Sequence, residues 1–325
     1  MSNPLLDTSS LPRFAEIAPE HVLPALEQLI SAHRSRLDEL LNTATDPDFD
    51  SLVLPLEDME HELSRVWSPV SHLQGVLGSP EWREVYTAAL PILTEHGTEL
   101  SQNVRLQQAY ARVDSHLSGD TSEARRSTVA LALRDFHLAG VDLPEREKTR
   151  FREIMQSLAA IRADFDHNVQ DASDAWALPV DDVAELDGLP PQVVQRAAAE
   201  ASRRDRDGWL LTLDFPTYHA VMTQAENRGL RETFYHGWVT RASDQGANDE
   251  WDNSGNIEEI LALRHEAAKL VGFDSYADYS LATKMAESSG QVIDFLRDLA
   301  AHSRPAAEAE LAELREFAGM TVEPW

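Results

Sequence analysis

The stretch LVLPLEDMEHELSRVWSPV, residues 52–70, decides the fold of this sequence. Its apolar side chains recur at alternating steps of four and three residues, at Leu52, Leu56, Met59, Leu63, Val66 and Val70. This spacing places them on one face of an α-helix and is typical of a seam that packs on another helix. Pro69 is expected to end or kink that helix, because proline removes a backbone hydrogen bond. The stretch therefore predicts a helical protein.

The same helical periodicity continues on both sides of this stretch. Ser79-Pro80 is typical of an N-cap followed by proline at the first helical position, and Gly140 is a plausible helix stop. Ser288 with Gln291 three residues later predicts the start of the last helix. Loops are expected at 243–255 and 272–276. Further helices are expected over 20–42, 80–102, 104–116, 122–139, 144–171, 191–204, 218–226, 229–240, 256–271 and 292–318.

Two short segments interrupt the helical pattern. Residues 176–180 and 209–213 are rich in residues that favour strands, and acidic residues or glycine flank them. We expect at most a small strand pair here, in an otherwise all-α, predominantly helical fold. The change in texture also predicts a domain boundary, with one helical domain over 1–171 and a second region over 172–325.

Composition excludes several classes of function. The 325 residues are 42% apolar and 26% charged, which fits a globular chain of about two domains. The absence of cysteine excludes disulfides, thiol nucleophiles, Cys-ligated zinc and iron–sulfur clusters. The net charge of −28 argues against nucleic acid and anionic membranes as partners. No signal peptide and no membrane-spanning run is recognised in the sequence.

The motifs of common catalytic sites are missing from the sequence. It contains no G-x-S-x-G, no phosphate-binding G-x-x-x-x-G-K-[ST] and no G-x-G-x-x-G. Two stretches begin like the zinc motif H-E-x-x-H, at His61-Glu62 and at His265-Glu266. Both place a cation, Arg65 or Lys269, where the second histidine ligand belongs. Neither stretch is therefore expected to bind zinc.

Carboxylate–histidine pairs offer no better metal site. Asp58 with His61, and Asp164 with His167, share only the three-residue spacing of the E-x-x-H motif of di-iron bundles. We interpret both as surface charge pairs. His33 lies within an apolar stripe and is expected to be a histidine at the edge of the core rather than a ligand.

Aromatic residues gather near the loop that follows residue 240. They are Phe234, Tyr235, Trp238 and Trp251. Two interpretations stay open, a wall that binds peptides and ordinary core packing.

Segments that run in order along the whole chain carry a resemblance to a known family. The clearest is Thr240-Arg241-Ala242-Ser243-Asp244-Gln245-Gly246. With the others, it resembles the oligopeptidase A branch of the thimet-oligopeptidase-like zinc metallopeptidases. The other segments are residues 3–6, 11–14, 17–22, 67–73, 133–136, 210–214, 251–254, 258–266 and 281–287.

The resemblance implies an architecture and an activity. Members of this family have a helical two-domain clamshell around a deep, narrow channel that admits short peptides. One zinc ion, held by an H-E-x-x-H helix and a further glutamate, hydrolyses internal peptide bonds. The implied role is cytoplasmic clearance of short peptides, including cleaved signal peptides.

The sequence departs from the family in one respect. It ends at Glu323-Pro324-Trp325, before the point at which family members carry their H-E-F-G-H segment. We therefore expect no catalytic, cofactor-binding or metal-binding residue in this chain, zinc ligands outside it, and no activity of the chain alone. It would be a fragment, a truncated reading frame or half of a split enzyme, whose partners are short peptides and the missing catalytic half. The alternative is a non-catalytic helical protein that binds peptides or a partner.

The last expected helix carries an apolar stripe that needs a covering surface. Without the catalytic half, an exposed apolar patch is predicted there. Pro305 should bend this helix. The stripe consists of Val292, Leu296, Leu299, Leu311, Leu314 and Phe317.

Overall fold

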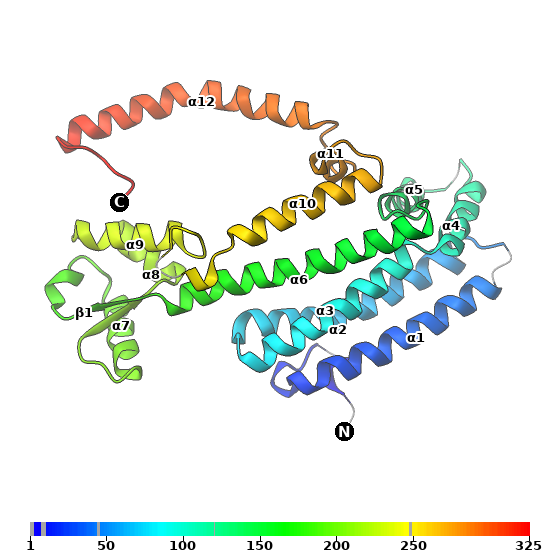
Figure 1. Cartoon of the computed structure of the whole chain (residues 1–325), viewed down its shortest axis with the longest axis horizontal. Coiled ribbons are helices and arrows are strands. Elements are labelled where there is room, and N and C mark those ends of the chain that lie inside the picture. Colours follow the sequence, from blue (N-terminus) through cyan, green and yellow to red (C-terminus); the bar gives the residue numbers. More distant parts are fainter. Residues whose placement is uncertain (1–2, 8–10, 44–45, 120, 247–248) are drawn as a thin grey trace. The chain divides into compact units, whose positions relative to one another are not determined.

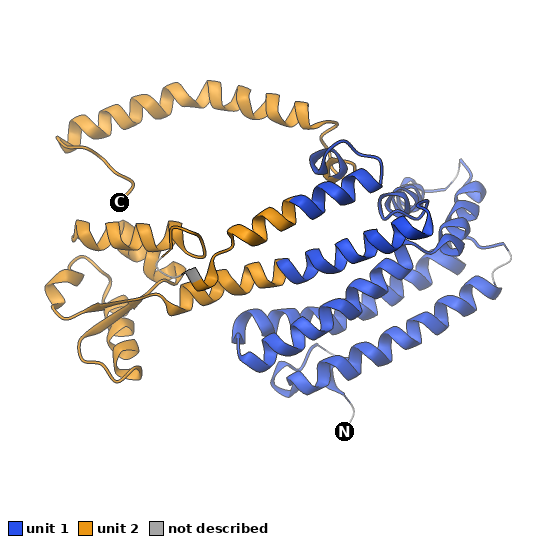
Figure 2. Cartoon of the chain, in the orientation of Figure 1, with its two compact units in different colours: residues 1–161, 262–279 blue, residues 162–261, 280–325 orange. Residues whose placement is uncertain are grey.

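The computed structural model describes residues 3–7, 11–43, 46–119, 121–246 and 249–325. Within these ranges the chain forms twelve α-helices and one two-stranded sheet (Figure 1), which confirms the predicted fold class. Contacts divide the chain into two compact units (Figure 2). Unit 1 comprises residues 1–161 and 262–279, and unit 2 comprises residues 162–261 and 280–325. The domain boundary expected near residue 171 stays a prediction.

Unit 1 begins with three helices that pack on one another, α1 (Val22–Thr43), α2 (Leu54–Leu77) and α3 (Pro80–Ser101). Gly78 ends α2 with φ +57°, and the Ser79 hydroxyl accepts a hydrogen bond from the Trp82 amide at 3.5 Å to start α3. Three short 3₁₀ turns precede α1: η1 (Pro4–Leu6), η2 (Phe14–Glu16) and η3 (Pro19–His21). The apolar cluster at this end includes Val22, Leu26, Val66, Val70 and Trp82.

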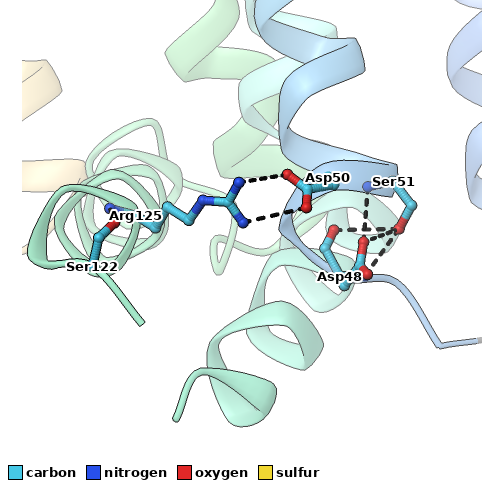
Figure 3. A network of polar contacts seen from close by, with 5 residues as sticks. All are labelled: Asp48, Asp50, Ser51, Ser122 and Arg125. Carbon is cyan, nitrogen blue, oxygen red and sulfur yellow. Dashed lines mark hydrogen bonds and ion pairs between the residues drawn. The ribbon is translucent and has the colours of Figure 1, made fainter. Parts of the chain in front are cut away.

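A second apolar cluster lies around α4 (Val104–His116), α5 (Glu123–Leu138) and the π-helical turn η4 (Phe49–Val53). Figure 3 shows how polar contacts hold this turn. Asp48 accepts a hydrogen bond from the Ser51 amide at 2.8 Å, and the Ser51 hydroxyl accepts one from the Asp48 amide at 3.0 Å. Arg125 on α5 donates to both carboxylate oxygens of Asp50, at 2.7 and 3.3 Å, and so ties α5 to the turn.

Parts of two long helices complete unit 1, together with most of α11 (Tyr276–Leu281), up to Tyr279. The long helices are α6 (Glu145–Ala175) and α10 (Ser254–Leu270), each of which contributes its other part to unit 2. The Tyr279 hydroxyl on α11 donates to the carbonyl of Leu138 at 3.1 Å. This bond anchors α11 to the end of α5.

Unit 2 contains the antiparallel strand pair β1 (Ala177–Val180) and β2 (Trp209–Thr212), with Ala177 opposite Thr212 and Val180 opposite Trp209. The short η5 turn (Val183–Leu186) and α7 (Pro191–Arg203) connect the strands, and α7 packs on β2. The helices α8 (Phe215–Gln224) and α9 (Arg228–Thr240) follow and pack on each other. Their shared core includes Val180, Leu211, Leu213, Val221 and Phe234. The predicted strand pair is thus confirmed.

Three sequence predictions need correction. Of the two effects expected of Pro69, an end or a kink, the end is wrong: α2 continues to Leu77, because packed apolar neighbours on both sides hold the helix through the missing hydrogen bond. The α8 helix starts at Phe215 rather than at residue 218, since Asp214 caps it by accepting from the Thr217 amide at 3.0 Å. The short helix α11 was not predicted, and the loop expected over 272–276 ends at its first residue.

The last helix, α12 (Ser289–Ala318), is the least buried element of unit 2. The Ser288 hydroxyl accepts from the Gln291 amide at 3.2 Å, as predicted, and the helix continues through Pro305 with a gentle curve (Figure 1). Its apolar side chains are exposed: Phe295 by 65%, Leu296 by 54% and Phe317 by 90%. No helix among the described residues is long and apolar enough to cross a membrane.

Candidate functional site

The first near match to a zinc motif, on α2, is engaged in other contacts. His61 is exposed. The Glu62 carboxylate lies 3.1 Å from Nε2 of the buried His33 and 3.7 Å from the Arg36 guanidinium. Arg65 occupies the position of the second ligand. His33 is only 3% exposed, so it lies in the core, deeper than the core edge predicted from the sequence.

The second near match, on α10, is engaged as well. Arg150 on α6 binds both carboxylate oxygens of Glu266, at 2.6 and 2.7 Å, and the pKa of the Glu266 carboxyl is lowered, first by this hydrogen bond. His265 is exposed and Lys269 pairs with Asp274. Among the described residues, no three His, Asp or Glu side chains come together in a group that could hold a metal ion. The residues present do not fit the zinc ion that the family resemblance implies.

The two carboxylate–histidine pairs, Asp58 with His61 and Asp164 with His167, belong to no metal-binding group among the described residues. Asp58 and His61 are exposed on α2, and Asp164 is exposed on α6. His167 is half-buried and has a partner of its own. Nothing in these surroundings distinguishes the pairs from surface charges on helices.

A hollow of about 760 Å³ lies in unit 2 where the last turn of α6, the helix α9, residues 240–246 and Trp251 meet. Two indoles, an imidazole and a guanidinium line it, those of Trp176, Trp251, His236 and Arg241. The remaining lining is small or neutral apart from Glu232. An aromatic wall with one cation is suited to an extended peptide, because rings cover apolar side chains and a guanidinium binds carboxylates and carbonyl oxygens.

A glycine allows one wall of this hollow to form. A Cβ atom on Gly237 would lie 2.7 Å from Nε1 of Trp176, too close for any larger residue. The α9 helix therefore approaches the Trp176 indole directly, and the same indole makes an edge contact with Phe234, with ring centroids 4.8 Å apart. Phe234 is fully buried, so it fixes the indole from the side of the core.

Another part of the lining, around Ala242, depends on one buried asparagine. Asn253 is 1% exposed, and its side chain donates to the carbonyl of Phe165 on α6 at 3.1 Å. Its side-chain oxygen accepts from Asn168 at 3.0 Å and from Asn256 at 2.8 Å. The backbone amide of Asn253 donates to the carbonyl of Ala242 at 3.1 Å. These bonds hold the segment after α9 against α6, with Ala242 at the unusual φ of +51°.

The cation of the site is held by an aromatic ring rather than by an acid. The Arg241 guanidinium lies 3.7 Å from the centroid of the Trp238 ring, and Trp238 in turn stacks on Tyr218. Burial lowers the pKa of Arg241, and the guanidinium stays protonated at any physiological pH. No described carboxylate pairs with it. Arg241 is therefore available to an anionic group of a ligand.

The four aromatic residues singled out in the sequence divide between the two interpretations. Phe234 belongs to the core, and Trp238 packs against that core while it holds Arg241. Trp251 lines the hollow. Tyr235 lies instead against Trp325, with ring centroids 5.5 Å apart. Both core packing and a wall are thus present, in different members of the cluster.

Sequence reasoning missed Trp176 and His236 as lining residues. Trp176 was assigned to a strand but precedes β1, and its contact with Gly237 joins positions far apart in the sequence. Arg241 carried a signal, since it lies in the segment with the clearest family resemblance.

Comparisons with known proteins find two family models that match parts of the chain. Residues 26–148 match the Neurolysin/Thimet oligopeptidase N-terminal domain, and residues 221–325 match Peptidase family M3. The second match includes α9 and the segment that lines the hollow. The chain therefore carries an N-terminal domain of the Neurolysin/Thimet oligopeptidase type and a region of the Peptidase family M3 type.

Several of the relatives that it matches are described as oligopeptidases. The chain is 44% identical over 332 residues to Oligopeptidase A of Escherichia coli and 43% identical to Oligopeptidase A of Salmonella typhimurium, which covers 100% of this chain and 49% of each relative. It is 34% identical to the Probable cytosolic oligopeptidase A of Arabidopsis thaliana, over 98% of this chain and 46% of that relative. The chain spans about half the length of the curated relatives it matches and corresponds to their N-terminal portion.

Proposed function

We propose that this chain is the N-terminal part of a zinc-dependent oligopeptidase that hydrolyses internal bonds of short peptides. The observation that carries the proposal is the 44% identity to Oligopeptidase A of Escherichia coli. The alignment covers 100% of this chain and so includes both of its units. In this proposal the single zinc ion and its ligands belong to chain beyond this sequence. The chain alone is inactive.

The part that this chain plays is to bind the peptide. The rings of Trp176 and Trp251 cover apolar side chains, and Arg241 binds a carboxylate or a main-chain carbonyl of the substrate. Its pairing with Trp238 orients the guanidinium without neutralising it. Binding by these groups positions the peptide and excludes water along its length, while the hydrolytic step needs groups that this chain does not supply.

The finer parts of the proposal are substrate source and location. We place the protein in the cytoplasm and include cleaved signal peptides among its substrates. The resemblance to a relative described as a probable cytosolic oligopeptidase A supports the location. The net charge of −28 favours basic and neutral peptides over acidic ones as they approach.

A second candidate function is a non-catalytic helical protein that binds peptides or a partner. The engaged glutamates of the two zinc-like motifs fit both candidates, since Glu62 and Glu266 serve as structural ion-pair partners in this chain. The two candidates share the peptide site and differ in whether a catalytic half completes the protein.

Peptide binding is tested by fluorescence anisotropy with a short labelled peptide that has a free C-terminal carboxylate. We expect Arg241→Ala and Trp251→Leu each to weaken binding by about tenfold, the effect of losing a charge-assisted bond or an aromatic contact worth about 1.4 kcal/mol. Arg112→Ala, at an exposed position on α4, is the matched control and should bind like the parent. Equal affinity of the parent, R241A and W251L would show that the peptide does not use this hollow.

A further inference from the structure

A second hollow, of about 720 Å³, lies within unit 1. Side chains from five helices, α1 to α5, line it. It separates the two apolar clusters of the unit, since Met59 and Leu106 belong to one cluster and Leu63 and Leu93 border the other. The helices are therefore tightly packed at both ends and leave a mostly apolar space between.

A buried histidine that lines this space has one ring nitrogen without a protein partner. His96 on α3 is 3% exposed, and its Nδ1 atom makes no hydrogen bond within the described part of the chain. Burial lowers its pKa, helped by the nearby His33 and Arg34 and opposed by Glu99, so the ring is neutral at pH 7. A buried ring nitrogen without a partner is costly, and a ligand that bonds to it recovers that cost.

A tyrosine from a neighbouring helix contributes to the same wall. Tyr110 on α4 is 7% exposed and lines the hollow, and no described residue bonds to its hydroxyl group. Burial, together with the charges of Glu57 and Glu60, raises the pKa of Tyr110 to about 12. The phenol is therefore neutral and can donate as well as accept.

The rim of the hollow is acidic. Glu57 and Glu60 lie one helical turn apart on α2, both exposed, and neither pairs with a cation among the described residues. Asp135 also lines the hollow but is engaged by Arg134 at 2.7 Å. The two free carboxylates would attract a cationic group at the mouth.

We propose that this hollow binds an apolar amine that carries a neutral hydroxyl group. The apolar body would lie among Leu63, Trp67 and Phe136. The hydroxyl would bond to His96 and Tyr110 at the buried end, and the ammonium would pair with Glu57 and Glu60 at the rim. This ligand site is independent of the peptide site in unit 2, so either assignment can fail without the other.

Isothermal titration calorimetry of the full chain with tyramine tests the proposal, because tyramine has the phenol, the apolar ring and the ammonium in line. We expect saturable binding of one molecule. Phenethylamine, which lacks the hydroxyl, and 3-(4-hydroxyphenyl)propionate, which carries a carboxylate in place of the ammonium, should each bind at least about fivefold more weakly. Equal binding of the amine and the carboxylate would overturn the proposal.

Two variants with matched controls place the ligand. Gly97 lines the hollow within α3, and a Cβ there meets nothing within 4 Å, so Gly97→Leu should fold while it fills the space and abolishes tyramine binding. Gly75→Leu, at an equally open helical glycine on α2 away from the lining, should bind as the parent does. A G97L variant that melts like the parent and still binds tyramine would exclude this hollow as the site.

The charge at the rim is tested in the same way. The double variant Glu57→Gln, Glu60→Gln should weaken tyramine binding by about fivefold. It should not weaken the binding of 3-(4-hydroxyphenyl)propionate. The control is Glu310→Gln, Glu313→Gln, which removes the same two charges at the same spacing on the exposed α12. If both double variants have the same effect, only the net charge matters and the rim assignment is wrong.

Discussion

Two long amphipathic helices of this chain, α2 and α12, differ in the burial of their apolar side chains. On α2, Met59, Val66 and Val70 are 3%, 1% and 0% exposed. On α12, Leu296 and Phe317 are 54% and 90% exposed. Both helices end at a left-handed glycine and have an internal proline and an apolar stripe, so these local features do not distinguish them. The difference is whether the described chain supplies a covering surface.

The exposed stripe of α12 has a physical cost that a partner can remove. Monomeric proteins rarely expose a large contiguous apolar patch, and such a patch usually marks an interaction surface. In the proposed function, the catalytic half of the oligopeptidase would supply the surface that covers it. In the proposed enzyme, α2 is internal to its unit and α12 is the element that joins the two halves.

The largest effect should separate these two helices directly. We expect Val66→Asp on α2 to destabilise the chain by at least about 3 kcal/mol, because a charge would be buried without a partner. Leu296→Asp on α12 should change the free energy of unfolding by less than about 0.5 kcal/mol, as expected of an exposed position. Urea unfolding of both variants measures this. A comparable loss in L296D would mean that α12 is packed, which would break the comparison.

A smaller effect is expected at the segment that walls the peptide site. Asn253→Ala removes three side-chain hydrogen bonds at a buried position and should cost about 2 kcal/mol of stability. It should also weaken peptide binding, since the segment after α9 loses its attachment to α6. Asn256→Ala, which removes only one of these bonds, is the control and should cost less. If both variants lose the same stability, the Asn253 network does not hold the wall.

The smallest effect concerns the buried histidine of unit 1. The pKa of His96 is lower in the folded chain than its ordinary value of 6.5, with desolvation the main cause and His33, Arg34 and Glu99 the neighbouring charges. Below pH 6.5 the unfolded chain therefore binds more protons than the folded one. The stability associated with neutral His96 is fully present above that pH and is lost as the pH falls through the folded-state pKa.

The pH dependence is measured by urea unfolding at several pH values between 7 and 5. We expect His96→Leu to reduce the loss of stability on acidification relative to the parent. His61→Leu, at an exposed histidine on α2, should leave it as in the parent. An unchanged pH profile in H96L would show that His96 does not titrate abnormally.

Much of the fold could be predicted from the sequence, because it rests on local signals. The helix over 104–116 was expected with the bounds that it has, and Ser79 and Ser288 cap helices as expected. Pro69 misled the prediction, since tertiary packing outweighs a local breaker. Local periodicity fixed the helices but said nothing of what covers them.

The candidate sites could be predicted only in part. Trp176 and Gly237 meet across 61 positions of chain, and Asn253 reaches back to Phe165 on α6. A single sequence contains no signal for such contacts. The buried pair His33 and His96 is similar, because only their packing in one bundle turns two helical histidines into the lining of a hollow.

The measurement that tests the central claim most directly is peptide hydrolysis by reconstitution. The chain, alone and mixed with the C-terminal half of Escherichia coli Oligopeptidase A, is assayed with an internally quenched fluorescent peptide and zinc. We predict no turnover by either part alone, chelator-sensitive turnover by the mixture, and its loss when Leu296→Asp and Phe317→Asp are introduced together on α12. Turnover by this chain alone, with zinc bound in a one-to-one ratio, would contradict the account.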